Sequence, residues 1–226
     1  THYCLDSICH PYIFYKTGIY RKNNPNSLKY RGEHTHMEKD LDAIYYKKFT
    51  NKAYNHCKIN KEIIKNPIFS KELLSLISNT YKKTYNKDNI GIIYQKAIKH
   101  AKIINYFIFN DKFGIKKAIF KRIDKLTNKK FGYLEGYSNY NLKPNTNYLN
   151  LDHKIWNHPS NKEITYAYSF EDLFNISLKK AIDIIKEVNK VLYKNKSITI
   201  LKKAIPNLDY ATGVSIKDSC RMDYFE

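Results

Sequence analysis

The sequence predicts an all-α protein. Several segments carry apolar residues at three- and four-residue spacing, which is the pattern of a helix with one buried face. Two of these segments begin with a serine that is suited to cap a helix. The alternation of apolar and polar residues that marks a strand is sparse, and we expect a strand only at 197–201. Together these observations favour a multi-helix bundle.

Beyond a short helix at the start of the chain, we expect helices over 34–58, 70–85, 90–109, 116–126 and 169–193. The first of these has an apolar stripe that runs from Met37 to Phe49. Ser70 is placed to cap the second, and Ser169 with Asp172 resembles a capping box at the start of the last. The segment 90–109 is the most apolar, which predicts a central helix.

Two segments lack a helical period. One, at 22–31, is punctuated by Asn and Pro and is followed by Gly32, and the other, at about 132–168, is rich in Tyr, Asn, Pro and His. A loop as long as the second is either functional or disordered. The sequence contains no internal repeat and no domain linker. A chain of 226 residues can form one core, so we expect a single helical domain over 1–226.

The composition excludes several classes of protein. The chain is 42% hydrophobic and 15% aromatic, which is too apolar for a disordered protein. Its four cysteines form no CxxC pair, which excludes a disulfide-dense scaffold and a thiolate zinc ribbon; Cys4 and Cys9 are expected to be buried small residues. The sequence contains no run of eighteen uncharged apolar residues, so no membrane-spanning helix is predicted.

The net charge of +19 suggests nucleic-acid binding, but the kind of cation argues against it. Only four of the 40 cationic residues are arginines, the side chain suited to bidentate recognition of bases and phosphates. The lysines accompany abundant Asn, Ile and Tyr, a mixture that A/T-rich codons also produce. We therefore interpret the lysines as a solvated surface that an anionic lipid surface would attract.

Histidines and carboxylates near the start of the chain predict a metal site. His2, Asp6 and His10 follow one another at four-residue spacing, which stacks their side chains on one face of a helix. His34 and Glu38 repeat this spacing after the 22–31 loop. Imidazole and carboxylate ligands suit zinc, and two ligands at positions i and i+4 can close on one ion.

One such pair alone is more often a surface hydrogen bond or a weak ion pair than a ligand set. Two pairs joined by a loop favour the metal site. His36 and Asp40 have the same four-residue spacing on a face of the helix next to that of His34 and Glu38, and their role stays open. His56 and His100 stand alone inside expected helices and are interpreted as structural or exposed residues.

These motifs resemble those of the bacterial zinc-dependent phospholipase C family, and in particular its short clostridial members. The resemblance rests on His2-Tyr-Cys-Leu-Asp6, then His10-Pro-Tyr12, then Gly32-Glu-His34-Thr-His-Met-Glu38. Later segments also match: Asp152-His-Lys-Ile-Trp156-Asn-His-Pro159, Ser169-Phe-Glu-Asp-Leu-Phe174, Thr212-Gly213 and Met222-Asp-Tyr-Phe225. The resemblance therefore extends along the whole chain.

The resemblance implies an all-helical domain that holds one to three zinc ions in a cleft, where a zinc-activated water attacks the phosphodiester of a phospholipid head group. His2 and Asp6 fall on the family's His–x3–Asp ligand pair, and His34 and Glu38 fall on its His–x3–Glu pair. His10 precedes the turn proline, whereas the family's further ligand follows it, so His10 is expected as a shifted ligand or as support for one. Asp6, or an aspartate upstream, is the expected catalytic base.

The same resemblance implies that further ligands come from helices upstream of Thr1, so the chain is expected to be N-terminally truncated and inactive by itself. It implies a monomer that meets phospholipid, secreted or at the cell surface, with the cytoplasm as an alternative. His153 and His158 flank Trp156, and we expect that segment either to line the cleft or to be a packing loop with its tryptophan in the core.

Two other functions remain as alternatives. The first is a metal-binding helical domain without phospholipase activity, or one that acts on another phosphodiester such as a nucleotide. The second is a basic nucleic-acid-binding module with incidental histidines, for which salt-sensitive binding to duplex DNA would be the signature.

Overall fold

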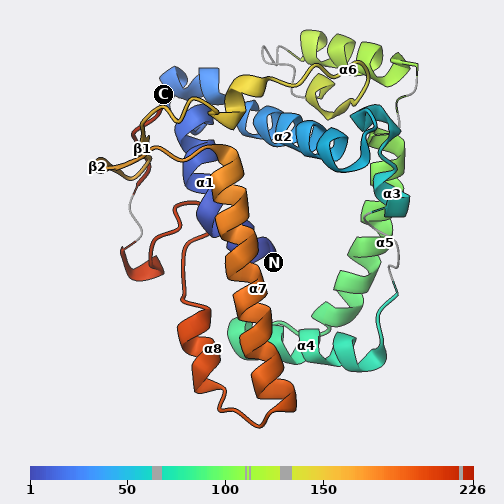
Figure 1. Ribbon diagram of the computed structural model, residues 1–226. Coiled ribbons are helices and arrows are strands. Elements are labelled where there is room, and N and C mark those ends of the chain that lie inside the picture. Colours follow the sequence, from blue (N-terminus) through green and yellow to red (C-terminus); the bar gives the residue numbers. More distant parts are fainter. Residues whose placement is uncertain (63–67, 110, 112, 128–133, 219–220) are drawn as a thin grey trace. The chain divides into compact units, whose positions relative to one another are not determined.

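The computed structural model describes residues 1–62, 68–109, 111, 113–127, 134–218 and 221–226, and these are mostly helical, as expected (Figure 1). The helices are α1 His2–Thr17, α2 Glu33–Thr50, α3 Ile59–Glu62, α4 Lys71–Tyr85, α5 Ile90–Phe109, α6 Ile115–Leu126, α7 Phe170–Tyr193 and α8 Thr199–Ala204. Strands β1 Trp156–His158 and β2 Asn161–Tyr166 form an antiparallel hairpin. No helix in the described part of the chain is long and apolar enough to cross a lipid bilayer.

The chain divides into two compact units. Unit 1 comprises residues 1–42 and 144–226, and unit 2 comprises residues 43–143. Unit 1 therefore holds α1, the hairpin, α7, α8 and the first turns of α2, whereas unit 2 holds the end of α2 and α3 to α6. The expectation of a single helical domain over 1–226 stays a prediction.

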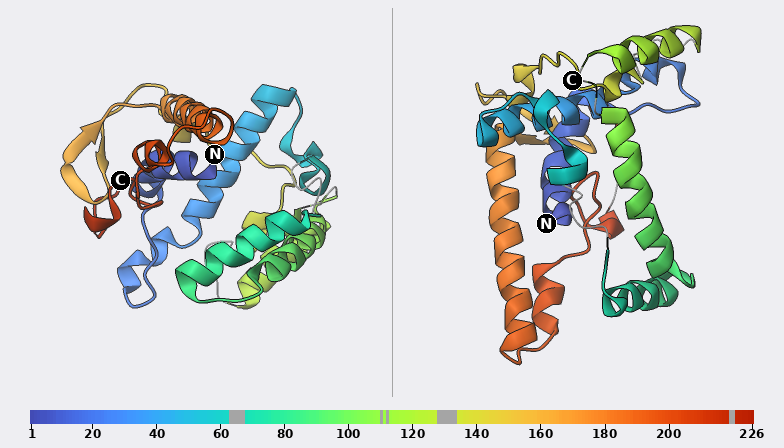
Figure 2. Two further views of the ribbon diagram at one scale, coloured as in Figure 1. Left: turned by 90° about the horizontal axis from the view of Figure 1, so that it is seen from below. Right: turned by 90° about the vertical axis from the view of Figure 1, so that its right-hand side faces the viewer.

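The core of unit 1 lies where α1 packs along α7, and the two helices lie side by side in Figures 1 and 2. Cys4, Cys9 and Tyr12 of α1 are buried there, which confirms the expectation for both cysteines. The ring of Tyr12 meets the edge of the Trp156 ring at a centroid distance of 5.1 Å. Buried aromatic pairs of this kind contribute both area and geometric preference, so they fix the hairpin against α1.

Helix α7 begins with the capping box that the sequence predicts. The Asp172 backbone N–H donates to Ser169 Oγ at 3.1 Å, and the Ser169 backbone N–H donates to Asp172 Oδ2 at 2.8 Å. Two first-turn amide groups that would otherwise lack a partner are thus satisfied.

The expectation of an irregular loop at about 132–168 was only partly correct. Its first two positions lie outside the described residues. The segment contains short 3-10 turns at Glu135–Tyr137 and Thr146–Leu149, followed by the β1–β2 hairpin. The hairpin forms because Trp156 pairs with Tyr166 across the strands, and because the Trp156 indole N–H donates to the Tyr168 carbonyl at 3.1 Å. Conversely, the strand expected at 197–201 was wrong, since α8 begins at Thr199.

The helices expected at 70–85, 90–109 and 116–126 are confirmed within a residue. The helix expected over 34–58 instead ends at Thr50, where Asn51 adopts a left-handed backbone conformation with φ of 56°. The expectation of a central helix at 90–109 was also wrong, because Ile92, Ile103 and Phe107 of α5 are each more than half exposed.

Candidate metal centre

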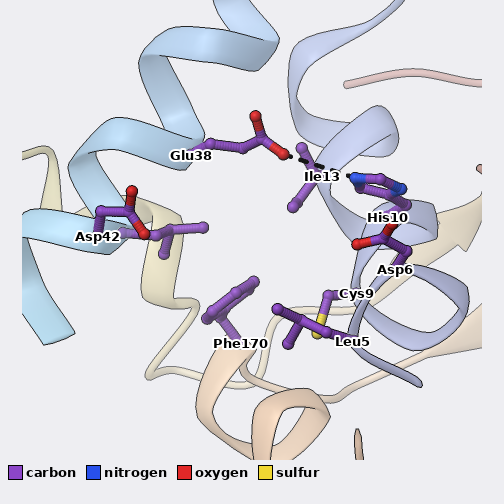
Figure 3. A pocket seen from close by; sticks show the side chains of 9 residues that line it. Leu5, Asp6, Cys9, His10, Ile13, Glu38, Asp42 and Phe170 are labelled. Atoms are coloured by element: carbon purple, nitrogen blue, oxygen red, sulfur yellow. Dashed lines mark ion pairs between the residues drawn. The ribbon is translucent and has the colours of Figure 1, made fainter. Parts of the chain in front are cut away.

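Helices α1 and α2 bring three metal-ligating side chains together inside unit 1. His10 comes from α1, and His34 with Glu38 comes from the first turns of α2. One ligand atom from each of the three lies within 4.8 Å of the other two. Figure 3 shows the Glu38 carboxylate directed across the gap between the helices toward the His10 ring. The four-residue spacing of His34 and Glu38 places both on one face of α2, as the sequence predicts.

Two distances within this cluster are close to those between the ligands of one zinc ion. His10 Nε2 lies 3.5 Å from Glu38 Oε1, and His34 Nε2 lies 3.2 Å from the same oxygen. Tetrahedral zinc with metal–ligand distances of about 2.0–2.2 Å separates neighbouring ligand atoms by about 3.4 Å. The ligand atoms of His10 and His34 lie within 4.8 Å of each other, so the three side chains could hold one ion.

A hydrogen bond fixes which nitrogen of His10 is available. Its Nδ1 lies 2.8 Å from the carbonyl oxygen of Tyr210. A carbonyl only accepts, so Nδ1 carries the proton and donates it, and in the neutral ring the lone pair of Nε2 points toward Glu38. Metal-binding histidines are typically oriented by such a bond on their other nitrogen.

His34 is held differently. Its ring packs against Phe14 at a centroid distance of 4.7 Å and against His10 at 5.3 Å. Its Nδ1 is buried and has no hydrogen-bond partner among the described residues. Ring packing, rather than a second hydrogen bond, therefore sets the orientation of His34.

The cluster shifts the ionisation of its members. Burial raises the pKa of Glu38, but hydrogen bonds and charge from His10 and His34 outweigh it and lower that pKa to about 2. Burial lowers the pKa of His10, yet the Glu38 carboxylate, the Tyr210 carbonyl and Asp6 together raise it. Both shifts favour a negative carboxylate facing a cation, which is the arrangement that a divalent metal would also satisfy.

Asp6 lies beside the cluster, and His2 lies outside it. Asp6 lines a cavity of about 270 Å³ next to His10, and its carboxylate accepts from His2 Nε2 at 2.9 Å. The side chain of His2 is 86% exposed, and it is absent from the described group of converging ligands. The cavity is lined by Leu5, Asp6, Cys9, His10, Ile13, Glu38, Leu41, Asp42 and Phe170, of which Figure 3 labels all but Leu41.

The loop that supplies the Tyr210 carbonyl was missed by the sequence reasoning as part of the site. Gly213, with φ of 68°, lets this loop lie against α1, because a Cβ there would come within 2.1 Å of the Ser7 carbonyl oxygen. That carbonyl faces Pro11, which has no N–H to give it the usual helical hydrogen bond. Two signals in the sequence could have indicated this contact: Pro11 inside the first helix, and the Thr212-Gly213 pair.

His153 and His158 make contacts within unit 1 that are separate from the metal cluster. His158 is buried, and its Nε2 lies 2.8 Å from the Thr212 carbonyl oxygen. His153 Nδ1 lies 2.9 Å from the Ala167 carbonyl oxygen. Trp156 is also buried, so this segment is the packing loop with its tryptophan in the core, the second of the two expectations. Asp40, which the sequence pairs with His36, accepts instead from the Asn145 backbone N–H at 2.9 Å.

Comparisons of the chain with models of protein families, with curated proteins and with solved structures find no match. The interpretation of this centre therefore depends on its own geometry and on the motifs of the sequence.

Proposed function

We propose that the protein is a zinc-dependent phosphodiester hydrolase that cleaves phospholipid head groups, in the manner that its resemblance to the phospholipase C family implies. The observation that supports this most directly is the convergence of His10, His34 and Glu38 within 4.8 Å. Two imidazoles and one carboxylate form a ligand set typical of catalytic zinc sites, which keep one coordination position open.

Zinc held by these three residues would supply a Lewis acid for the phosphoryl oxygen and lower the pKa of water toward ~7. The chain's own residues would do the rest. Asp6 lies beside His10, and its carboxylate is oriented by His2, so it is placed to accept the proton of an attacking water. Leu5, Leu41 and Phe170 give the adjoining cavity an apolar wall that suits the acyl side of a lipid.

Zinc affinity is the first test of the site. Isothermal titration of the metal-free chain with zinc is expected to show binding that His34→Ala and Glu38→Gln each weaken by about 10–100-fold. His100→Ala is the matched control, because His100 is an exposed histidine of α5 and is expected to leave the affinity unchanged. Equal affinity in all four proteins would contradict the ligand assignment.

Activity tests the chemistry. Zinc-dependent, chelator-sensitive release of choline phosphate from phosphatidylcholine is measured on the full-length protein. We expect turnover and its loss in Asp6→Asn and His34→Ala. Zinc binding without turnover of lipid would favour the non-catalytic alternative, and turnover of a nucleotide phosphodiester alone would favour the differently specific one.

A further inference from the structure

Helix α6 in unit 2 has its apolar face outward. Ile115, Ile119 and Leu126 lie on one side of the helix and are 62%, 51% and 79% exposed. Asp124, on the opposite side, is only 4% exposed. A helix on the surface of a globular protein normally buries its apolar stripe and presents its charges to water, so α6 has the reverse orientation.

Hydrogen bonds hold α6 in this orientation. The Asp124 carboxylate accepts from the backbone N–H groups of Leu134 and Glu135 at 2.8 and 2.9 Å. Before the helix, Asp111 accepts from the backbone N–H of Lys117 at 2.8 Å and from the Ser138 hydroxyl at 2.8 Å. Turning the isoleucines inward would break these bonds and leave buried polar groups without partners, which is costly.

The apolar stripe is bordered by cations. Lys121, Arg122 and Lys125 are exposed, and in the part of the chain that the structure describes no carboxylate pairs with them. The acidic residue of the helix is Asp124, and it faces inward. Phe113, just before α6, adds a further apolar side chain that is 81% exposed. The outward surface is thus an apolar stripe with positively charged side chains along one margin.

This combination identifies the partner by its chemistry. An amphipathic helix with an apolar face and flanking cations lies in the interface of a bilayer, where its lysines extend to the head groups. Anionic lipids attract such cations. Duplex nucleic acid would leave the isoleucines and Leu126 in water, and a second copy seated face to face would oppose cations with cations.

We propose that the outward face of α6 docks onto an anionic phospholipid bilayer, with Ile115, Ile119 and Leu126 at the acyl boundary and Lys121, Arg122 and Lys125 among the head groups. The biological purpose of this docking rests on the proposed function, because an enzyme that cleaves phospholipid must reach a lipid surface. The docking itself requires neither zinc nor turnover.

Vesicle co-sedimentation of the 226-residue chain in the presence of a chelator tests the proposal, since the chelator removes hydrolysis. Vesicles of phosphatidylcholine alone are compared with vesicles that also contain phosphatidylglycerol. We expect binding to the anionic vesicles, weakened by salt, and a loss of about tenfold or more in Ile119→Ser/Leu126→Ser and in Lys121→Gln/Lys125→Gln. The matched controls are Leu151→Ser/Ile155→Ser and Lys194→Gln/Lys196→Gln, which alter equally exposed residues of unit 1.

Circular dichroism of each variant shows that it remains folded, which separates lost docking from lost structure. Binding that is equal in the α6 variants and their controls would overturn the proposal, as would equal binding to both kinds of vesicle. Light scattering measures the molar mass of the unsubstituted chain and of the α6 variants. If the α6 substitutions lower the molar mass but leave vesicle binding unchanged, the occupant of this face is a second copy of the chain, and the proposal is overturned. His34→Ala is expected to dock normally, so failure of the zinc site and failure of the docking surface are distinguishable.

Discussion

His10 Nδ1 lies 2.8 Å from the carbonyl oxygen of Tyr210, so a residue of the first helix is oriented by the backbone of a loop 200 positions later in the chain. In the neutral ring this bond places the proton on Nδ1 and leaves the lone pair on Nε2, the nitrogen that faces Glu38. The orientation of the candidate ligand His10 therefore depends on a backbone carbonyl, which no side-chain motif in the sequence indicates.

The first prediction separates this histidine from another with the same kind of bond. His10→Gln is expected to lower zinc affinity by about 10–100-fold, because the substitution removes an imidazole ligand. His153→Gln is the control, since His153 Nδ1 also lies 2.9 Å from a backbone carbonyl, that of Ala167, yet His153 belongs to no group of three potential ligands among the described residues. Calorimetric titration with zinc measures both, and an equal loss in the two variants would contradict the assignment of His10.

The second prediction concerns the stability of the metal-free chain as a function of pH. The pKa of His10 is raised above 6.5, so its contribution is fully present below pH 6.5 and is lost as the pH rises through the raised value. The pKa of Glu38 falls from 4.5 to about 2, so its contribution is present above pH 4.5 and is lost as the pH falls toward 2. The pair therefore stabilises the fold most between pH 4.5 and 6.5.

Thermal unfolding followed by circular dichroism checks this dependence, and His10→Gln should flatten it in this range. The effect is expected to be under about 1 kcal/mol because Glu38 is partly exposed. Zinc affinity should change with the opposite sign and increase with pH, since the metal requires a neutral imidazole. Zinc binding that strengthens as the solution is acidified would contradict the site.

The third prediction compares two glycines with left-handed backbone conformations. Gly213→Ala places a Cβ about 2.1 Å from the Ser7 carbonyl oxygen, so it should displace the loop that carries the Tyr210 carbonyl and lower both stability and zinc affinity. Gly114→Ala meets the Tyr140 ring at 2.6 Å in unit 2 and should lower stability alone. A zinc affinity that is unchanged in Gly213→Ala would show that the loop does not orient His10.

The fourth prediction concerns the capping box of α7. Ser169→Ala is expected to cost about 1–2 kcal/mol of unfolding free energy, because it removes the acceptor of the Asp172 N–H at a buried helix start. Ser75→Ala, at an exposed position within α4, should be neutral or slightly stabilising through helix propensity. Urea denaturation measures both, and equal effects would contradict the role of the cap.

The sequence was most informative where a signal is local. The serine caps at 70 and 169, and the four-residue spacing of His34 and Glu38, each depend on residues within one turn of helix, and the structure contains them. The strand at 197–201 was predicted from a short alternating run, which cannot be distinguished from a helix start over so few residues.

Long-range features could not be predicted in this way. His2 has the same spacing from Asp6 that His34 has from Glu38, yet only the second pair joins His10 in the described group of potential ligands, because tertiary packing decides which turn of α1 lies opposite the start of α2. The apolar spacing over 116–126 likewise predicts a helix but does not show which side of it faces the protein. Its orientation depends on Asp124 and the backbone of Leu134, which lies ten positions later.

The packing of α1 on α7 also determines the order in which the metal centre can be assembled during translation. Roughly 150 residues separate the end of α1 from the start of α7, so at ~5–20 residues per second the ribosome needs about 8–30 s to complete that interval. Throughout this time α1 lacks its partner α7, and the Tyr210 carbonyl has not been synthesised. The side of α1 that packs on α7 is thus uncovered well before the Tyr210 carbonyl can orient His10.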